Sequence, residues 1–150
     1  MIAHVFYTFQ QCREDLARWT KDLDAADVWR PPAAGLAPLG FQLRHMAGSA
    51  ERLFTYLQGG ALSAEQLAFL KAEMVAGAPL DELMAELDAV FARIEEGLRA
   101  VTAEQFTDER GVGRQGLPTT VGGLVVHIAE HTQRHLGQAV LTAKLLRESR

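Results

Sequence analysis

Four long stretches of this 150-residue chain repeat apolar residues every three or four positions. This spacing places the apolar side chains on one face of an α-helix. We expect helices over about residues 2–26, 38–58, 80–101 and 119–147. Because each helix is long and amphipathic, it can bury its apolar face only against the other helices. The pattern therefore predicts an all-α fold, an up-and-down four-helix bundle in a single domain spanning residues 1–150.

The connections between these stretches contain residues that interrupt helices. Two prolines and a glycine over residues 29–35 predict a loop after the first helix. Residues 102–118 are expected to form an irregular connection, since period-two patterns typical of strands are almost absent. After it, Thr119 or Thr120 can cap the last helix.

The connection between the second and third long helices has a pattern of its own. Ser63 and Gln66 have the spacing of a capping box, which marks the start of a helix. We therefore expect a short extra helix that runs to Gly77. Its inward side would carry three apolar residues: Leu67, Leu70 and Met74.

Composition excludes several classes of protein. Apolar residues make up 48% of the chain, enough for a buried core, and 15 basic against 19 acidic residues give a net charge of −4. Without a basic patch, nucleic acid and membrane surfaces are poor partners. No apolar run approaches the ~20 residues that a bilayer requires, and no secretory leader is recognised, so we expect a cytoplasmic protein. Cys12 is the single cysteine and falls on an apolar face, which predicts a buried, unreactive thiol.

Histidines are the most informative polar residues of the last predicted helix. His127, His131 and His135 recur every four positions and share a face with apolar residues. A buried imidazole needs a hydrogen-bond partner or a metal ion. Because eight residues of helix span roughly 12 Å, His127 and His135 cannot bind the same ion. The last helix can therefore supply at most one pair of ligands four residues apart.

A third ligand would have to come from His45 or His4. His45 lies at the edge of the apolar face of the second helix, whereas His4 lies in the first turn of the first helix, where we expect solvent exposure. Three neutral imidazoles leave coordination positions of a divalent ion open, which is typical of a catalytic centre. The alternative is that these histidines are hydrogen-bonded core residues without a metal. Glu130, at the margin of the histidine face, is interpreted as a surface carboxylate or a hydrogen-bond acceptor.

Three segments resemble the DinB/YfiT-like superfamily. Residues 119–138 are similar to its C-terminal helix and contain its His-x-x-x-His-x-Gly-Gln motif, which starts at His131. The part of its second helix that carries a histidine is similar to Leu43-Arg44-His45-Met46. Residues 62–67 resemble its connecting segment. The resemblance implies a four-helix bundle with one divalent ion, nickel, zinc or iron. It implies the ligands His45, His131 and His135, so that His127 would orient a ligand or fill the core.

The resemblance also implies an activity. Characterised relatives are transferases or isomerases that use bacillithiol, mycothiol or glutathione, and members often form dimers. We therefore expect a metal ion that activates a small thiol for attack on an electrophile, in a protein able to form a homodimer. Arg52, Arg134 and Gln138 are candidates for contacts with the substrate. The alternatives are a metal-dependent hydrolase and a non-catalytic bundle with a structural or vestigial metal site.

A shared ion sets one condition on the fold. His45 is expected about six residues into its helix and His131 about twelve into its own, so the two helices must be staggered for their histidines to meet.

Overall fold

A computed structural model describes residues 1–149. Within this range the chain forms five α-helices, two short 3₁₀ helices and one hairpin of two strands. The α-helices are α1 (Ile2–Thr20), α2 (Leu39–Leu57), α3 (Ala64–Ala72), α4 (Leu80–Arg99) and α5 (Val121–Glu148). The 3₁₀ helices span Ala25–Asp27 and Glu104–Thr107, and the strands are β1 (Glu109–Val112) and β2 (Leu117–Thr120).

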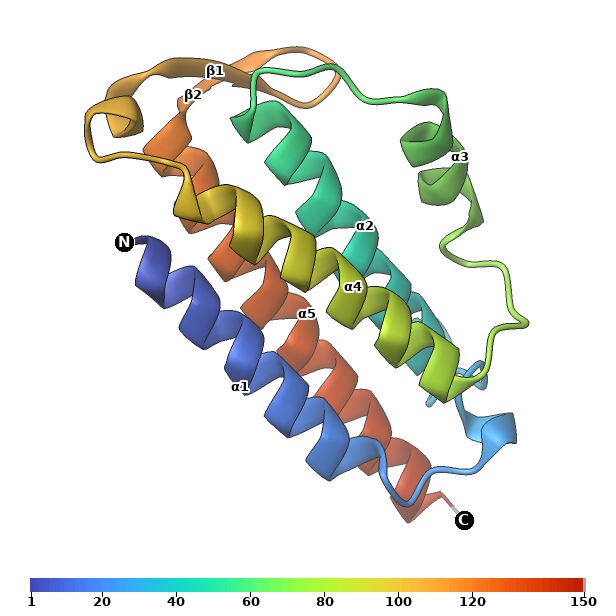
Figure 1. The fold of residues 1–150 in the computed structure, drawn as a ribbon. Coiled ribbons are helices and arrows are strands. Elements are labelled where there is room, and N and C mark those ends of the chain that lie inside the picture. The colour runs from blue at the N-terminus through green and yellow to red at the C-terminus, as the bar shows by residue number, and fades with distance from the viewer. Residues whose placement is uncertain (150) are drawn as a thin grey trace.

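The four long helices pack into a bundle, as the sequence predicted (Figure 1). Helices α1 and α2 each pack against both α4 and α5. The directions of the helices do not alternate along the chain, however. Helices α2 and α4 run in the same direction, and α1 and α5 run in the opposite one (Figure 1).

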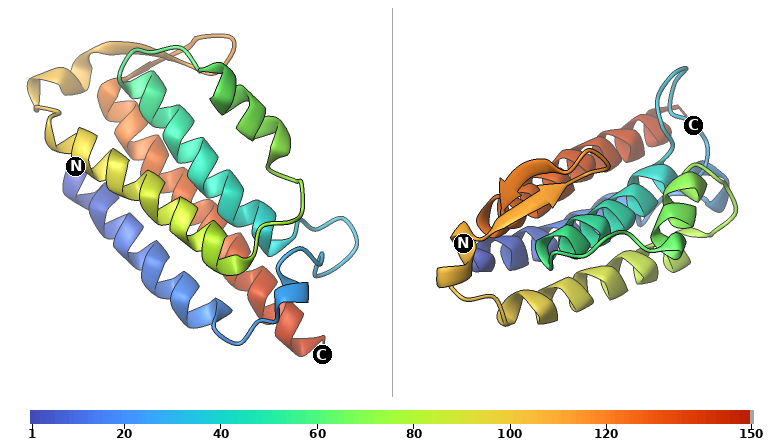
Figure 2. Two further views of the ribbon diagram at one scale, coloured as in Figure 1. Left: turned by 45° about the vertical axis from the view of Figure 1, so that its right-hand side comes forward. Right: turned by 90° about the horizontal axis from the view of Figure 1, so that it is seen from above.

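The long connection between α2 and α4 explains this order. It contains α3 and carries the chain back to the end of the bundle where α2 began (Figure 2). Trp29 Nε1 donates a hydrogen bond to the carbonyl of Ala78 over 2.8 Å, and the amide of Gly40 donates to the carbonyl of Val28 over 2.8 Å. These bonds tie the starts of α2 and α4 to the same loop. The bundle therefore consists of two parallel pairs, α2 with α4 and α1 with α5, that run in opposite directions. The direction of the helices does not alternate strictly along the chain.

The core lies between the four long helices and is almost entirely apolar where α1 meets α4. There the rings of Phe9 and Phe91 stack with centroids 3.9 Å apart. Cys12 is buried in the same core, as expected, and burial raises the pKa of its thiol to about 12. A thiol with this pKa is protonated at neutral pH and unreactive.

Two helices are shorter than the sequence suggested. Helix α1 ends at Thr20 instead of Ala26, and the chain then turns into a 3₁₀ helix with a capping box between Asp24 and Asp27. Helix α3 starts at the expected capping box of Ser63 and Gln66 but ends at Ala72.

The inward orientation predicted for Leu67, Leu70 and Met74 is wrong. These side chains are 41%, 37% and 59% exposed, and α3 has no buried residue. The reason is that α3 stands over α2 at the outside of the bundle and does not join the core (Figure 2).

The connection before α5 is more regular than expected. Strands β1 and β2 pair antiparallel, with Glu109 opposite Thr120, and are joined by a turn over residues 113–116. Neither strand alternates apolar and polar residues, so no period-two pattern marks them in the sequence. Thr120 caps α5, one of the two predicted caps, by accepting a hydrogen bond from the amide of Gly123 over 3.1 Å.

None of the helices within residues 1–149 combines the length and the apolar character needed to cross a membrane.

Candidate metal centre

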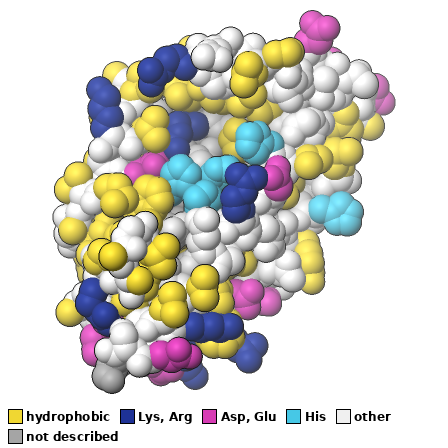
Figure 3. Space-filling view, turned by 180° about the vertical axis from the view of Figure 1, so that it is seen from behind, with side chains coloured by type: hydrophobic (Ala, Val, Ile, Leu, Met, Phe, Trp, Pro, Cys, Tyr) yellow, Lys and Arg dark blue, Asp and Glu magenta, His cyan; other side chains and the backbone are white. Residues whose placement is uncertain are grey.

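Three histidines from two helices converge on one side of the bundle. His45 of α2 and His131 and His135 of α5 each offer a ring nitrogen, and these nitrogens lie within 4.8 Å of one another. The ring centroids are 4.4 to 5.2 Å apart. A cluster of histidine side chains is visible at the surface of this face in Figure 3. His4, the other residue considered for the third ligand, is exposed in the first turn of α1.

The stagger that the site requires is present. Helix α5 has 28 residues and α2 has 19, and the two run antiparallel. The extra turns of α5 extend past the start of α2, where Arg147 donates a hydrogen bond to the carbonyl of Trp19 over 2.7 Å. The middle of α5 is therefore level with the first half of α2, and His45 faces both histidines of α5.

Each of the three rings is held by an oxygen atom of the protein at Nδ1. The three contacts are His45 to Glu73 Oε2 at 2.7 Å, His131 to Ser49 Oγ at 3.1 Å, and His135 to Gln42 Oε1 at 2.8 Å. Amide and carboxylate oxygens can only accept a hydrogen bond. The hydroxyl of Ser49 donates its own proton to the carbonyl of Met46, so it accepts from the ring. Assigned from these partners, every Nδ1 carries a proton, which leaves Nε2 as the nitrogen of each ring that can bind an ion.

The charge state of the rings suits a metal ion. Burial, together with the charges of the neighbouring histidines and Arg134, lowers the pKa of both His131 and His135 to about 4. Both rings are therefore neutral at pH 7. A neutral imidazole is the form that binds a divalent ion, so the residues present fit such an ion.

Glu73, the residue that fixes His45, was not singled out by the sequence. Its side chain is 3% exposed and lies directly after α3, where Oε1 accepts a hydrogen bond from Arg52 over 2.8 Å. Burial opposes ionisation of this carboxyl, but the hydrogen bonds from His45 and Arg52 and their charges outweigh it, so its pKa is lowered. The residue lies 28 positions from His45 in a connection, and no periodic pattern marks it.

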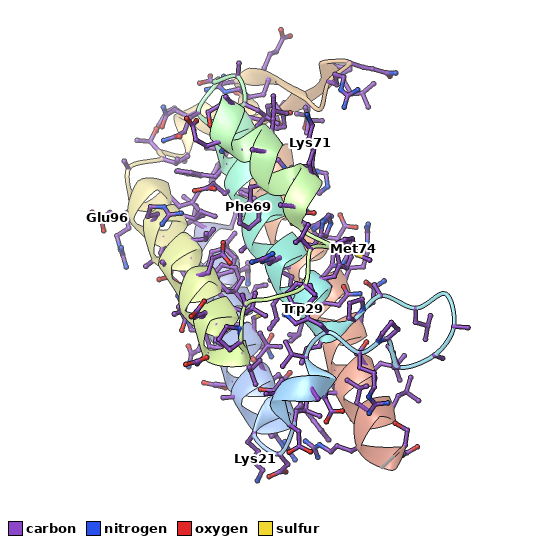
Figure 4. The ribbon with its side chains drawn as sticks, turned by 90° about the vertical axis from the view of Figure 1, so that its right-hand side faces the viewer. Lys21, Trp29, Phe69, Lys71, Met74 and Glu96 are labelled. Carbon is purple, nitrogen blue, oxygen red and sulfur yellow. The ribbon has the colours of Figure 1, made fainter. Side chains whose placement is uncertain are left out.

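Gly48 allows Glu73 to come this close to α2. A Cβ atom at this position would lie 2.7 Å from Arg52 Nη1, from Glu73 Oε1 and from the ring of Phe69. Phe69 belongs to α3 and points toward α2 (Figure 4). A glycine in the middle of a helix is costly by itself, and here it makes room for the segment that carries Glu73.

A cavity of about 530 Å³ opens beside His45 and His131. It is enclosed by α2, α3, the hairpin and α5, and its size is typical of a site for a small molecule. Its walls are mostly apolar, with Leu53, Leu67 and Leu70 among them.

The other residues proposed for the site are dispersed. His127 lines the same cavity, and its ring centroid lies 5.9 Å from that of His131, but it is not part of the cluster of three. Arg52 lines the cavity as well. Arg134 is exposed and pairs with Glu130 on the surface of α5, which agrees with the interpretation of Glu130 as a surface carboxylate. Gln138 is exposed and lines a separate cavity of about 310 Å³ next to Gln42, but its side chain also interacts with His135, where it opposes the lowering of the pKa.

Comparison with known proteins agrees with this architecture. A family model described as the DinB superfamily matches residues 8–139. The chain belongs to the DinB superfamily. A search of curated proteins gave no match.

Two solved structures share the fold of this DinB-superfamily chain. A conserved protein from Enterococcus faecalis is 19% identical, with a TM-score of 0.77 over 96% of this chain and 95% of its own. YfiT from Bacillus subtilis is 13% identical, with a TM-score of 0.73 over 95% of this chain and 86% of its own. YfiT is described as a probable metal-dependent hydrolase with an unusual four-helix bundle topology. At this identity these two structures show the fold alone.

Proposed function

We propose that this chain is a metal-dependent transferase that activates a low-molecular-weight thiol for attack on an electrophile. The observation that supports it is the convergence of His45, His131 and His135, each with Nδ1 held and Nε2 left for an ion, beside a cavity. A set of three imidazoles suits zinc, nickel or iron. When bound, such an ion would lower the pKa of a coordinated thiol so that thiolate is present near neutral pH.

The lining of the cavity favours a thiol over water as the nucleophile. No aspartate or glutamate among the described residues lines this cavity. Glu73 lies behind it, and both of its carboxylate oxygens are engaged. Without a carboxylate base, the nucleophile must be acidic enough for the ion to ionise it. A free thiol has a pKa of ~8.5, whereas free water has ~15.7 and reaches ~7 only when it is bound to an ion, so the thiol requires the smaller shift.

The remaining residues would orient and shelter the reactants. Glu73, Ser49 and Gln42 fix the three rings, and rings fixed in this way lose little freedom when they bind an ion. The apolar walls of α2 and α3 would keep water away from the electrophile. His127 lines the cavity beside His131, and in this proposal it would accept the proton of an incoming thiol.

A metal-dependent hydrolase is the second candidate, and the shared fold with YfiT favours it. In this function water would replace the thiol, and His127 would have to act as the base. The two functions differ in a measurable way, because only the transferase consumes thiol.

The experiment begins with protein purified without an affinity tag and analysed for its metal content. The protein is then incubated with bacillithiol, mycothiol or glutathione and the electrophile 1-chloro-2,4-dinitrobenzene, and separately with the ester p-nitrophenyl acetate. We expect one divalent ion per chain and conjugation of one of the thiols, both removed by a chelator. Hydrolysis of the ester without use of thiol would instead assign the hydrolase function.

A pair of variants tests the role of the histidines. His131→Ala should lose both the ion and the conjugation. His4→Ala is the matched control, since His4 is exposed and remote from the cluster, and should keep both. A His131→Ala protein that binds the ion stoichiometrically and conjugates thiol would contradict the proposal.

A further inference from the structure

The cavity beside the three histidines has a charge opposite to that of the whole chain. We propose that it binds a molecule with an apolar body and one anionic head group, and that Arg114 holds the head group. The inference rests on the proposed function for its chemical meaning, because it names the class of substrate that this function would use. It can be tested by binding alone.

The distribution of charge indicates that the cavity can bind an anion. The chain has 19 acidic and 15 basic residues, yet the described residues around this cavity include two arginines and no carboxylate. Arg52 is already paired with Glu73. Arg114 forms no ion pair with any residue of the described chain, so its guanidinium is available to a ligand. Guanidinium groups bind carboxylate and phosphate through two parallel hydrogen bonds.

The hairpin carries Arg114 to the cavity in a fixed place. Arg114 lies in the turn between β1 and β2, whose end residues Gly113 and Gly116 have φ of 74° and 60°. These angles favour glycine. Arg110 of β1 donates a hydrogen bond to the carbonyl of Leu57 over 2.8 Å, which ties the hairpin to the end of α2. The arginine therefore stands on an anchored strand pair.

The apolar wall of the cavity indicates that the ligand also has an apolar body. Leu67 and Leu70 belong to α3, line the cavity and are 41% and 37% exposed. Leu62 and Val112 extend this wall toward the hairpin. Apolar side chains grouped around a cavity are covered from water when an apolar ligand enters. The cavity therefore combines one unpaired cationic group with apolar walls, and an anionic amphiphile satisfies both.

The test measures binding of three probes with the same eight-carbon chain by isothermal titration calorimetry. The probes are octanoate, octyl phosphate and octan-1-amine. We expect the two anions to bind at least tenfold more tightly than the amine, and the stronger of the two identifies carboxylate or phosphate as the preferred head group. Equal affinity for all three probes would overturn the proposal.

Two substitutions locate the head group and the chain. Arg114→Gln should weaken octanoate about tenfold, a loss in the range of one charge-assisted hydrogen-bond pair, and should leave octan-1-amine unchanged. Arg18→Gln is the matched control, because Arg18 is an exposed arginine on α1 without an ion pair, and should keep the preference for anions. Leu70→Asn, which adds no charge, should weaken octanoate by about tenfold. If Arg114→Gln and Arg18→Gln behave alike, Arg114 does not hold the head group.

The titrations are repeated on protein stripped of metal and on protein reloaded with zinc. We expect the affinity for octanoate to depend on Arg114 in both forms. If octanoate binds only to the zinc form and ignores Arg114, it ligates the ion, and the inference fails while the proposed metal centre stands. If zinc does not bind but the dependence on Arg114 persists, the proposed function fails and the anion site stands.

Discussion

The interface between α1 and α4 and the interface between α2 and α5 are built by different means. The first packs the stacked rings of Phe9 and Phe91 in an apolar core. The second buries Gln42 and Ser49, which hydrogen-bond to His135 and His131 of α5. Apolar burial contributes most of the free energy of folding, whereas a hydrogen bond inside a protein contributes little net stability. The comparison suggests that one interface stabilises the fold and the other orders the site.

The largest expected effect is on the apolar interface. Phe91→Ala removes a fully buried ring that stacks on Phe9, and it should lower the free energy of unfolding by ~3–5 kcal/mol. Urea unfolding followed by circular dichroism measures this. Val126→Ala, at a side chain 52% exposed on α5, should change stability by less than ~0.5 kcal/mol. Loss of zinc binding in folded Phe91→Ala protein would show that the two interfaces are not independent.

The next largest effect is a stabilisation by zinc, which concerns only the interface between α2 and α5. Zinc at one hundred times its dissociation constant should raise the free energy of unfolding by ~2.7 kcal/mol, because it binds the folded chain. The same increment should appear in Phe91→Ala and disappear in His135→Ala. Thermal melts with and without zinc measure it. An unchanged increment in His135→Ala would remove this residue from the set of ligands.

A smaller effect on zinc binding is expected at Glu73, which hydrogen-bonds to His45. Glu73→Gln keeps the shape of the side chain but removes the charge that faces His45 and Arg52. Affinity for zinc should fall ~10–100-fold, in the range found for residues that orient metal ligands. Competition with a chromophoric chelator measures the affinity. Glu96→Gln, on the exposed side of α4, is the control and should match the unsubstituted chain.

The smallest effect is a pH dependence of the metal-stripped protein. The pKa of His131 and His135 is lowered to about 4 in the folded chain, and in the unfolded chain an imidazole titrates near ~6.5. Between these values the unfolded state binds more protons, so stability is present above pH ~6.5 and is lost as the pH falls toward 4. Because both rings are partly exposed to solvent, we expect a loss of order 1 kcal/mol. Replacing both residues by glutamine should flatten the profile between pH 6.5 and 4.

The bundle could be predicted because long amphipathic helices leave few ways to bury their apolar faces. The four long helices and the capping residues Ser63 and Thr120 follow from the sequence. The meeting of His45 with His131 and His135 agrees with the ligand set that the resemblance implied. Their role as ligands stays a prediction until metal is measured.

Features that depend on how distant segments meet could not be predicted. The parallel course of α2 and α4 follows from the path of a long connection, and the sequence does not encode that path as a period. Glu73 and Arg114 reach the site from a connection and a hairpin turn, where solvent-exposed patterns are usual. Leu67 and Leu70 follow a helical spacing that predicts burial, but a cavity lies where a core was expected.

The origin of Glu73 outside the bundle has a practical consequence for design. The three histidines belong to regular helices, so moving one of them means repacking the core. The carboxylate behind His45 is positioned instead by the length of chain between Leu57 and Leu80. Adding or deleting a residue there would shift this oxygen while α2 and α5 keep their register. The affinity for an ion could in this way be retuned by loop engineering, with the helical scaffold left as it is.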